Sequence, residues 1–249
     1  MLNDLSQKVR NAFLKEFYNS KTGVCSTGSQ TAYAMSLYTG LIPKEEKEKV
    51  FHNLVDSIKN NDYALTSGDV GYHFLVRVLS ENGKSDILYK MNSRSDRPGY
   101  GYQLKKGATA LTESWAALAS SSNNHMMLGH LMEWFYTGLG GIYQADNSVA
   151  YSDIIIAPKP FGNIKWVKCS YKSLKGVILS EWEIKENTFS LDIEVPENAS
   201  AKIVIPEGFR DLACKMTDLT RNNSFDVETT DGAFTVSSGK YKIIAKMTK

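Results

Sequence analysis

The sequence is short of several features that would point to particular classes of protein. Its three cysteines, Cys25, Cys169 and Cys214, are odd in number and far apart, which argues against a disulfide framework and against a Cys-x-x-Cys metal or redox site. No apolar run approaches the roughly 20 residues that a bilayer-spanning helix needs. With a net charge of +2 and no basic block, the chain offers no electrostatic reason to expect nucleic acid as a partner.

The N-terminus lacks the continuous apolar stretch of a signal peptide. Its sequence, MLNDLSQKVRNAFLKEF, instead predicts an amphipathic helix. We therefore expect a soluble chain in a reducing, cytoplasmic compartment, with no membrane partner. A periplasmic or secreted protein stays open if the native N-terminus lies upstream.

What the sequence does contain is two kinds of apolar patterning. Up to about Ile142 the spacing is helical, with apolar residues three or four apart. This holds for Leu2, Leu5, Val9, Phe13 and Phe17, for Phe51, Leu54, Val55 and Ile58, and for Leu128, Leu131, Met132, Phe135 and Leu139. Gly40 is placed to end one helix and Pro43 to begin the next, while Asn82-Gly83 separates two more.

From Tyr151 onward the apolar period becomes two, which indicates strands with one buried face. Phe189, Leu191, Ile193 and Val195 alternate with polar residues, and Asp231-Gly232 between two strand-like runs predicts a hairpin. Closely spaced strands of this kind predict an antiparallel β-sandwich. We expect the aromatic residues of these strands to lie in its core, with stacking on a sugar as the alternative: Trp166, Tyr171 and Trp182.

The expected architecture is therefore an α domain followed by a β domain. The boundary falls near Asp146-Asn147, so that residues 1–146 form the helical domain and residues 147–249 the β-sandwich.

Residues 98–142 hold the densest set of chemically useful side chains. A Gly- and Tyr-rich segment, predicted as a loop, precedes Glu113, Trp115 and His125. Aromatic faces stack on pyranose rings while carboxylates and imidazoles bond their hydroxyls, so this combination suits a sugar site. A surface carboxylate beside a core aromatic residue is the simpler alternative. We expect Met126, Met127, Met132 and Trp134 to pack in the core.

Other chemistries find little support. His125 and His130 lie five residues apart, on different faces of a helix, so they do not form a metal pair. No Gly-x-Ser-x-Gly nucleophile motif occurs, and the glycines of GLGGI follow a helix where a dinucleotide site requires a strand. We therefore expect neither a metal nor a cofactor.

Four segments in order resemble the catalytic domain of the bacterial α-L-rhamnosidases, family 78 of the glycoside hydrolases. They are GSQTAYAMSLYTGLIP, SGDVGYHFLVRVLSENGKSDILYKM, GATALTESW and SSSNNHMMLGHLMEWFYTGLGGI. The tail from IIIAPKP through IKWVKCSYKSLKGVI resembles the β-sandwich that follows that domain. Nearly the whole chain is covered, as the C-terminal part of such an enzyme.

The resemblance implies a partial (α/α)6 barrel and inverting hydrolysis of terminal α-L-rhamnosides. Inversion requires a protonated carboxyl at the leaving oxygen and a carboxylate that activates water on the opposite face. The family's base matches Glu113, and its pocket histidine matches His125; Trp115 and Asp69 fall in motifs near the same pocket. We expect Glu113 to face a sugar-sized hollow beside His125, with a rhamnose-containing oligosaccharide or glycoside as ligand.

The sequence departs from the family in two places. Ala116 stands where relatives often have an aspartate, and nothing before Gly28 resembles the acidic cluster that holds the general acid. We therefore expect a half-barrel with exposed apolar stripes, belonging to a fragment, a truncated product or a chain completed by another copy or chain. A catalytically incomplete remnant, a non-catalytic rhamnose-binding module and a helical scaffold for a protein partner are the alternatives to an active hydrolase.

Overall fold

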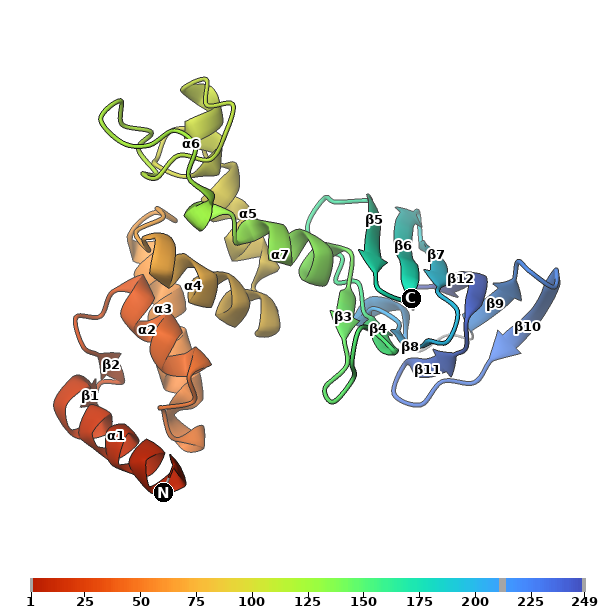
Figure 1. Ribbon diagram of the computed structural model, residues 1–249, viewed down its shortest axis with the longest axis horizontal. Coiled ribbons are helices and arrows are strands. Elements are labelled where there is room, and N and C mark those ends of the chain that lie inside the picture. Colours follow the sequence, from red (N-terminus) through yellow and green to blue (C-terminus); the bar gives the residue numbers. More distant parts are fainter. Residues whose placement is uncertain (1, 211–213, 248–249) are drawn as a thin grey trace. The chain divides into compact units, whose positions relative to one another are not determined.

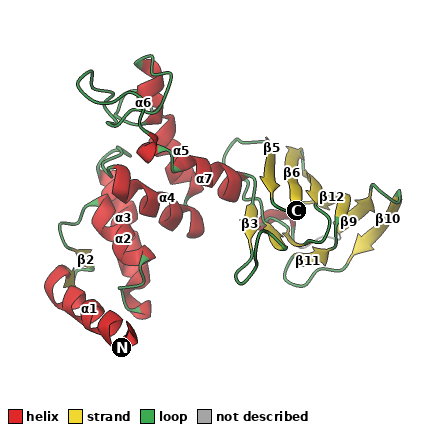
Figure 2. Ribbon diagram, viewed as in Figure 1, coloured by secondary structure: helices red, strands yellow, loops and turns green. Residues whose placement is uncertain are grey.

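The computed structural model describes residues 2–210 and 214–247, and it confirms a helical part followed by a β part (Figures 1 and 2). Two compact units divide the chain, Met1–Leu131 and Met132–Lys249. The sequence places the domain boundary at 146/147, and that boundary stays a prediction. Strand β3 (Ile142–Gln144) lies upstream of it and pairs with β4 (Asp153–Ile156).

The first helix forms where the apolar spacing predicts it, but it buries none of its residues. Helix α1 covers Leu2–Phe17 and leads into a small ribbon of β1 (Tyr18–Asn19) and β2 (Val24–Cys25). Leu2 and Leu5 keep 78% and 58% of their surface exposed. An apolar stripe therefore lies at the surface of the described residues.

The following helices pack on one another and form the core of the first unit. They are α2 (Gln30–Tyr38), the 3-10 turn η1 (Lys44–Glu46), α3 (Lys47–Asn60), α4 (Asp69–Glu81) and α5 (Ser85–Ser93). Gly40 and Gly83, at φ +69° and +70°, provide the left-handed positions after α2 and α4, as expected. The loop prediction for the Gly- and Tyr-rich segment is wrong in part, because Tyr100–Lys105 form the short helix α6.

The stretch after His125 is less regular than its apolar spacing suggests. It contains the 3-10 turn η2 (Met126–Leu128), the short α7 (Leu131–Trp134) and the π-helical turn η3 (Phe135–Leu139). Trp134 is buried as predicted. The core prediction is wrong for Met126, Met127 and Met132, which are exposed, since a broken helix presents no single continuous buried stripe.

The second unit is a sandwich of two sheets. The larger has the order β10-β9-β12-β7-β6-β5 and the smaller β11-β8-β4-β3. The strands not yet given are β5 (Trp166–Ser173), β6 (Gly176–Lys185), β7 (Thr188–Val195), β8 (Ser200–Val204), β9 (Cys214–Asp218), β10 (Asn223–Val227), β11 (Ala233–Val236) and β12 (Gly239–Lys246), with a 3-10 turn η4 (Glu207–Phe209). The smaller sheet is mixed, because β4 and β8 run parallel.

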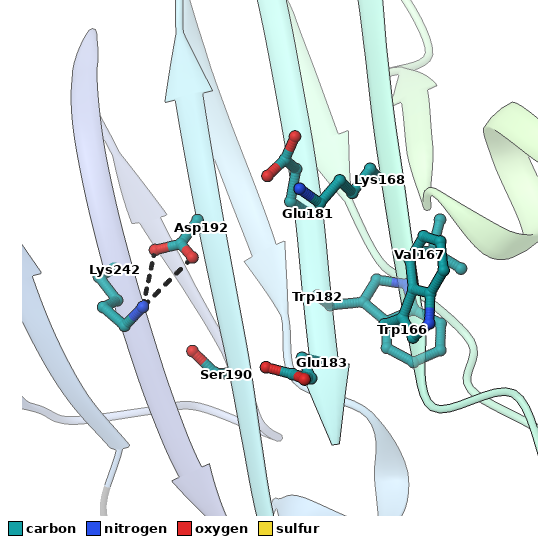
Figure 3. A pocket seen from close by; sticks show the side chains of 9 residues that line it. All are labelled: Trp166, Val167, Lys168, Glu181, Trp182, Glu183, Ser190, Asp192 and Lys242. Atoms are coloured by element: carbon teal, nitrogen blue, oxygen red, sulfur yellow. Dashed lines mark hydrogen bonds and ion pairs between the residues drawn. The ribbon is translucent and has the colours of Figure 1, made fainter. Parts of the chain in front are cut away.

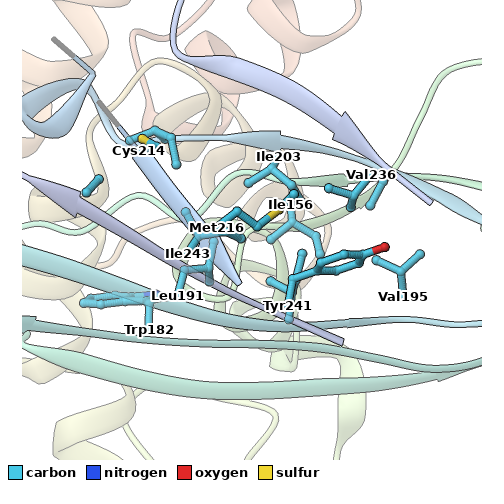
Figure 4. Close-up of a cluster of buried hydrophobic side chains, with 14 of the residues drawn as sticks. Ile156, Trp182, Leu191, Val195, Ile203, Cys214, Met216, Val236, Tyr241 and Ile243 are labelled. Carbon is cyan, nitrogen blue, oxygen red and sulfur yellow. The ribbon is translucent and has the colours of Figure 1, made fainter. Parts of the chain in front are cut away.

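The two sheets share one apolar core (Figure 4). Strand β7 alternates strictly, with Phe189, Leu191, Ile193 and Val195 buried as predicted. Trp182 is also in the core, but Trp166 and Tyr171 keep 63% and 38% of their surface exposed, so their predicted core positions are wrong. Register explains Trp166, which pairs with Glu183, the neighbour of Trp182, and so lies on the opposite face. Tyr171 pairs with the buried Ile178 and lies on the core face, but the edge strand leaves it partly exposed.

Asp231-Gly232 forms the tight turn that its sequence predicts, but not the hairpin. Both residues have positive φ (52° and 73°), and Thr230 bridges Ala233 across them. Strand β10 pairs with β9 and β11 with β8, so the segment crosses from one sheet to the other. Among the described residues, no helix has the length and apolar character needed to cross a bilayer.

Candidate functional site

Close packing between α2 and α4 positions the chain segment on which the candidate site is built. Gly71 on α4 has no side chain where Thr31 of α2 approaches, and a Cβ there would lie 2.1 Å from the Thr31 Oγ1. The Thr31 hydroxyl donates to the Ser67 Oγ at 3.2 Å, just before α4 begins. Glycine therefore allows the two helices to meet at the end where the chain enters α4.

The segment before α4 is held by one buried glutamine. The Gln30 Nε2 donates to the Ala64 carbonyl at 2.8 Å, and its Oε1 accepts from the Thr66 N–H at 3.1 Å. Gln30 is 3% exposed, so both of its polar atoms are satisfied inside the protein. This arrangement fixes the main chain at Ser67, whose carbonyl is available to another part of the fold.

Trp115 binds that carbonyl. Its indole Nε1 donates to the Ser67 oxygen at 2.6 Å, and its ring packs against Tyr72 and Tyr100 at centroid distances of 4.9 and 5.4 Å. The indole is only 8% exposed. Trp115 therefore anchors the loop that follows α6, and its predicted role as a pocket residue stays a prediction.

Glu113 lies two residues earlier, where the loop folds back on itself. Its N–H donates to the Ser122 carbonyl at 2.9 Å, and its Oε2 accepts from the Ser122 N–H at 3.1 Å. The side chain is exposed. One carboxylate oxygen is thus hydrogen-bonded to the opposing segment at Ser122, and the Glu113 side chain faces outward.

His125 lies on the same pair of chain segments as Glu113. Its N–H donates to the Leu111 carbonyl at 2.8 Å, which continues the pairing that begins at Ser122. Within residues 2–210 and 214–247, its Nε2 is buried without a hydrogen-bond partner. Because buried polar atoms are normally hydrogen-bonded, this nitrogen lacks a partner that a group outside the described chain would have to supply.

Asp69 is the first residue of α4 and is half-buried. Its Oδ1 accepts from the N–H of the next residue, Val70, at 2.8 Å. Only Gly68 separates it from Ser67, the acceptor of the Trp115 indole. Asp69 therefore belongs to the same locality, but its role in a pocket stays a prediction.

Two serines that the sequence did not single out hold two of the four predicted residues, Trp115 and Glu113. The Ser67 carbonyl receives Trp115, and the Ser122 main chain receives Glu113. Both act through backbone atoms, so their side-chain identity gave no signal. Glu113 and His125 line none of three hollows in the described chain, at Trp166–Lys242, Glu194–Lys240 and Glu16–Ser26. The expected enclosure around Glu113 stays a prediction.

Burial changes the ionisation of the phenols around Trp115. Burial raises the pKa of Tyr100 to about 12, and the Tyr100 hydroxyl donates to the Leu128 carbonyl. Burial also raises the pKa of Tyr72 well above its usual value, while the Tyr72 hydroxyl donates to the Asn92 Oδ1 at 2.8 Å. Both phenols are therefore neutral hydrogen-bond donors at physiological pH. Within the described ranges, no three His, Cys, Asp or Glu side chains gather closely enough to hold a metal ion.

Comparisons with known proteins give a consistent result. Residues 2–139 match the family model of the bacterial alpha-L-rhamnosidase 6 hairpin glycosidase domain, and residues 141–217 match that of the bacterial alpha-L-rhamnosidase C-terminal domain. An alpha-L-rhamnosidase of Formosa agariphila is 31% identical over 211 residues, which cover 81% of this chain and 23% of the relative. One of Streptomyces avermitilis is 29% identical over 212 residues, covering 82% of this chain and 20% of the relative.

Solved structures of alpha-L-rhamnosidases also match this chain. The crystal structure of the Streptomyces avermitilis alpha-L-rhamnosidase complexed with L-rhamnose matches with a TM-score of 0.86 at 28% identity, over 98% of this chain and 24% of that one. The alpha-L-rhamnosidase from Dictyoglumus thermophilum matches with a TM-score of 0.83 at 28% identity, over 98% and 28%. This chain spans about a quarter of the length of the relatives it matches.

Proposed function

We propose that this chain, which belongs to the bacterial α-L-rhamnosidase family, supplies the general base and part of the sugar pocket for inverting hydrolysis of terminal α-L-rhamnosides. Glu113 is the base. One observation carries the proposal: Glu113 and His125 lie on adjacent chain segments that are hydrogen-bonded to each other. The Glu113 side chain is exposed and bonds Ser122 through one oxygen, and the His125 Nε2 has no partner among the described residues.

The geometry fits what a base of this kind has to do. A base that activates water needs one oxygen free to accept the water proton. Glu113 uses its Oε2 toward the Ser122 N–H, which fixes the orientation of the carboxylate and leaves Oε1 available. The imidazole of His125, on the neighbouring segment, has an open hydrogen-bonding position for a sugar hydroxyl. Trp115 acts as a positioning residue, because its buried bond to Ser67 fixes the start of the loop.

The partner carboxyl has to lie on the opposite face of the sugar, roughly 6.5–9.5 Å from the base in inverting enzymes. We propose that it comes from a part of the protein outside these 249 residues, because the chain covers about a quarter of its relatives. The same part would enclose Glu113, whose side chain is exposed here. The exposed stripe of α1 is a second surface that such a part would cover.

A second candidate function is binding without hydrolysis. The exposed position of Glu113 favours it for this chain in isolation, since a base open to bulk water lacks the shielded site that strengthens catalysis. In that case the chain binds a terminal rhamnose through His125 without cleaving the bond.

Hydrolysis of p-nitrophenyl α-L-rhamnoside tests both candidates. We expect turnover by the wild-type chain, or by the chain joined to the preceding domains of a relative, to fall about 10²- to 10⁴-fold in Glu113→Gln. Glu81→Gln removes an exposed carboxylate at the end of α4 and is the matched control.

Each result has a distinct meaning. Equal rates in wild type and Glu113→Gln would remove Glu113 as the base. Saturable L-rhamnose binding with no turnover in either form of the protein would favour the non-hydrolytic candidate. Restored turnover of Glu113→Ala by added azide, giving a β-configured rhamnosyl azide, would support attack from the face that Glu113 occupies.

A further inference from the structure

One tryptophan of the β-sandwich is exposed on a sheet surface. Trp166 begins β5, the edge strand of the six-stranded sheet, and keeps 63% of its surface exposed, whereas Trp182 on the adjacent strand keeps 2%. Trp166 lies directly opposite Glu183, which in turn lies opposite Ser190 on β7. These three side chains therefore form one row across the outer face of the sheet, with Cβ atoms about 5 Å apart between neighbouring strands.

A shallow hollow of about 480 Å³ lies over this row (Figure 3). That volume is within the range of sites that hold small ligands, about 300–1,000 Å³. Besides the row itself, the hollow is bordered by a second row of charged residues: Lys168, Glu181, Asp192 and Lys242. The surface thus combines one broad aromatic ring with several side chains that can bond hydroxyl groups.

The charges around the hollow largely offset one another. The Lys242 Nζ lies 3.3 Å from the Asp192 Oδ2, and the Lys185 Nζ lies 2.8 Å from the Glu183 Oε2. Lys168 stands opposite Glu181 in register, and Figure 3 shows its side chain directed toward that carboxylate. No single sign of charge dominates the surface, so it is complementary to an uncharged polar ligand and not to a polyanion or polycation.

We infer that this face of the β-sandwich is a second saccharide-binding site, which takes a neutral pyranose on Trp166. The indole stacks on the apolar face of the ring, the Glu183 carboxylate accepts hydrogen bonds from its hydroxyls, and the Ser190 hydroxyl accepts or donates them. The site lies wholly in the second unit and does not involve Glu113. It therefore goes beyond the proposed function and does not rest on it.

A second copy of the chain is the other occupant that an edge strand can attract. Strand β5 carries lysines at Lys168 and Lys172, both exposed on the same face as Trp166. Lysines along an edge disfavour strand-to-strand addition, because two such edges repel each other. The composition of the edge thus argues for a small polar ligand over a protein strand.

Side-chain N–H signals of the four tryptophans in the 249-residue chain provide a residue-specific test. The probes are methyl α-L-rhamnopyranoside, methyl β-D-glucopyranoside and methyl β-D-xylopyranoside, with galacturonate as the charged counterpart. We expect at least one neutral pyranoside to shift the Trp166 signal in a saturable manner. The signal of the buried Trp182 should move less, and galacturonate should bind more weakly.

Two substitutions and two controls complete the design. Trp166→Ala should weaken binding by about tenfold or more, as expected for the loss of a stacked ring. Glu183→Ala should weaken it by a smaller factor. Phe225→Ala removes another exposed aromatic ring from the same sheet outside the hollow, and it should bind at Trp166 as wild type does. In Glu113→Gln the Trp166 signal should respond as it does in wild type, whatever happens at the rhamnose site.

Several results would overturn the proposed saccharide site at Trp166. An unmoved Trp166 signal with all three pyranosides, or undiminished binding by Trp166→Ala, would overturn the site. A concentration-dependent dimer that Trp166→Ala dissociates would assign the face to a second copy of the chain instead. Loss of the Trp166 response in Glu113→Gln would also overturn an independent site, whatever the rhamnosidase assay shows.

Discussion

The indole N–H of Trp115 lies 2.6 Å from the carbonyl oxygen of Ser67, and this bond joins the loop that carries Glu113 to the segment that leads into α4. Residues 48 positions apart in the chain are thereby fixed relative to each other. The hydroxyl of Tyr100 and the side chain of Gln30 support the same region from either side. Four predictions follow from contacts of this kind.

Trp115→Phe keeps an aromatic ring against Tyr72 but removes the donor to the buried Ser67 carbonyl. An unsatisfied buried carbonyl costs about 1–3 kcal/mol, so we expect the free energy of unfolding to fall by that amount. Urea denaturation followed by circular dichroism measures it. Trp166→Phe, at an exposed position, is the control and should stay within about 0.5 kcal/mol of wild type. Equal stability of the two variants would contradict the anchoring role of Trp115.

His125→Leu replaces the imidazole, whose buried Nε2 has no partner among the described residues, with an apolar side chain of comparable size. Because an unpaired buried polar atom is costly in the free protein, we expect stability to be unchanged or to rise by up to about 1–3 kcal/mol. Affinity for L-rhamnose at the Glu113 site should fall at the same time. Thermal denaturation and rhamnose titration measure the two effects. A large loss of stability would indicate a structural role for the imidazole instead.

Alkaline pH should destabilise the helical unit through its buried phenols. Burial raises the pKa of Tyr100 to about 12, and that of Tyr72 is raised as well, above the value near 10 of an unfolded tyrosine. The folded state therefore holds these protons more tightly, so their contribution is complete below pH 10 and is lost as pH rises through 10 toward 12. Denaturation midpoints at pH 9 and pH 11 should differ less in Tyr100→Phe than in wild type. An identical pH dependence in the two proteins would contradict a contribution of the Tyr100 phenol to stability.

Gly71→Ala places a methyl group 2.1 Å from the Thr31 Oγ1. Alanine favours a helix over glycine by about 1 kcal/mol, but overpacking of this kind typically costs about 1–3 kcal/mol, so the expected result is a net loss of stability. Thr31→Ala makes room for the methyl group, and the double variant Thr31→Ala/Gly71→Ala should recover much of the loss attributable to the clash. A double-mutant cycle measures that recovery. Purely additive effects would show that the two positions do not compete for space.

Some of the predictions failed because local sequence patterns do not specify which distant strand or main-chain group a segment binds. Asp231-Gly232 adopts the expected turn because its φ angles are a local property. Pairing is not local, and β10 and β11 find partners in different sheets. In the same way, nothing in the order of residues reveals that Ser67 and Ser122 use main-chain atoms to hold Trp115 and Glu113.

Sequence alone predicts the change from helices to strands, the helix ends at Gly40 and Gly83, the buried alternation of β7 and the rhamnosidase resemblance. All of these depend on periodicity, on single-residue conformational preference or on contiguous motifs, which are properties of neighbouring residues. Only the folded chain shows that the Trp115 indole binds a main-chain carbonyl, that the His125 Nε2 is buried without a partner among the described residues and that Trp166 faces outward. The physical reason is that burial and hydrogen bonding depend on residues far away in the chain, which register and helix packing bring together.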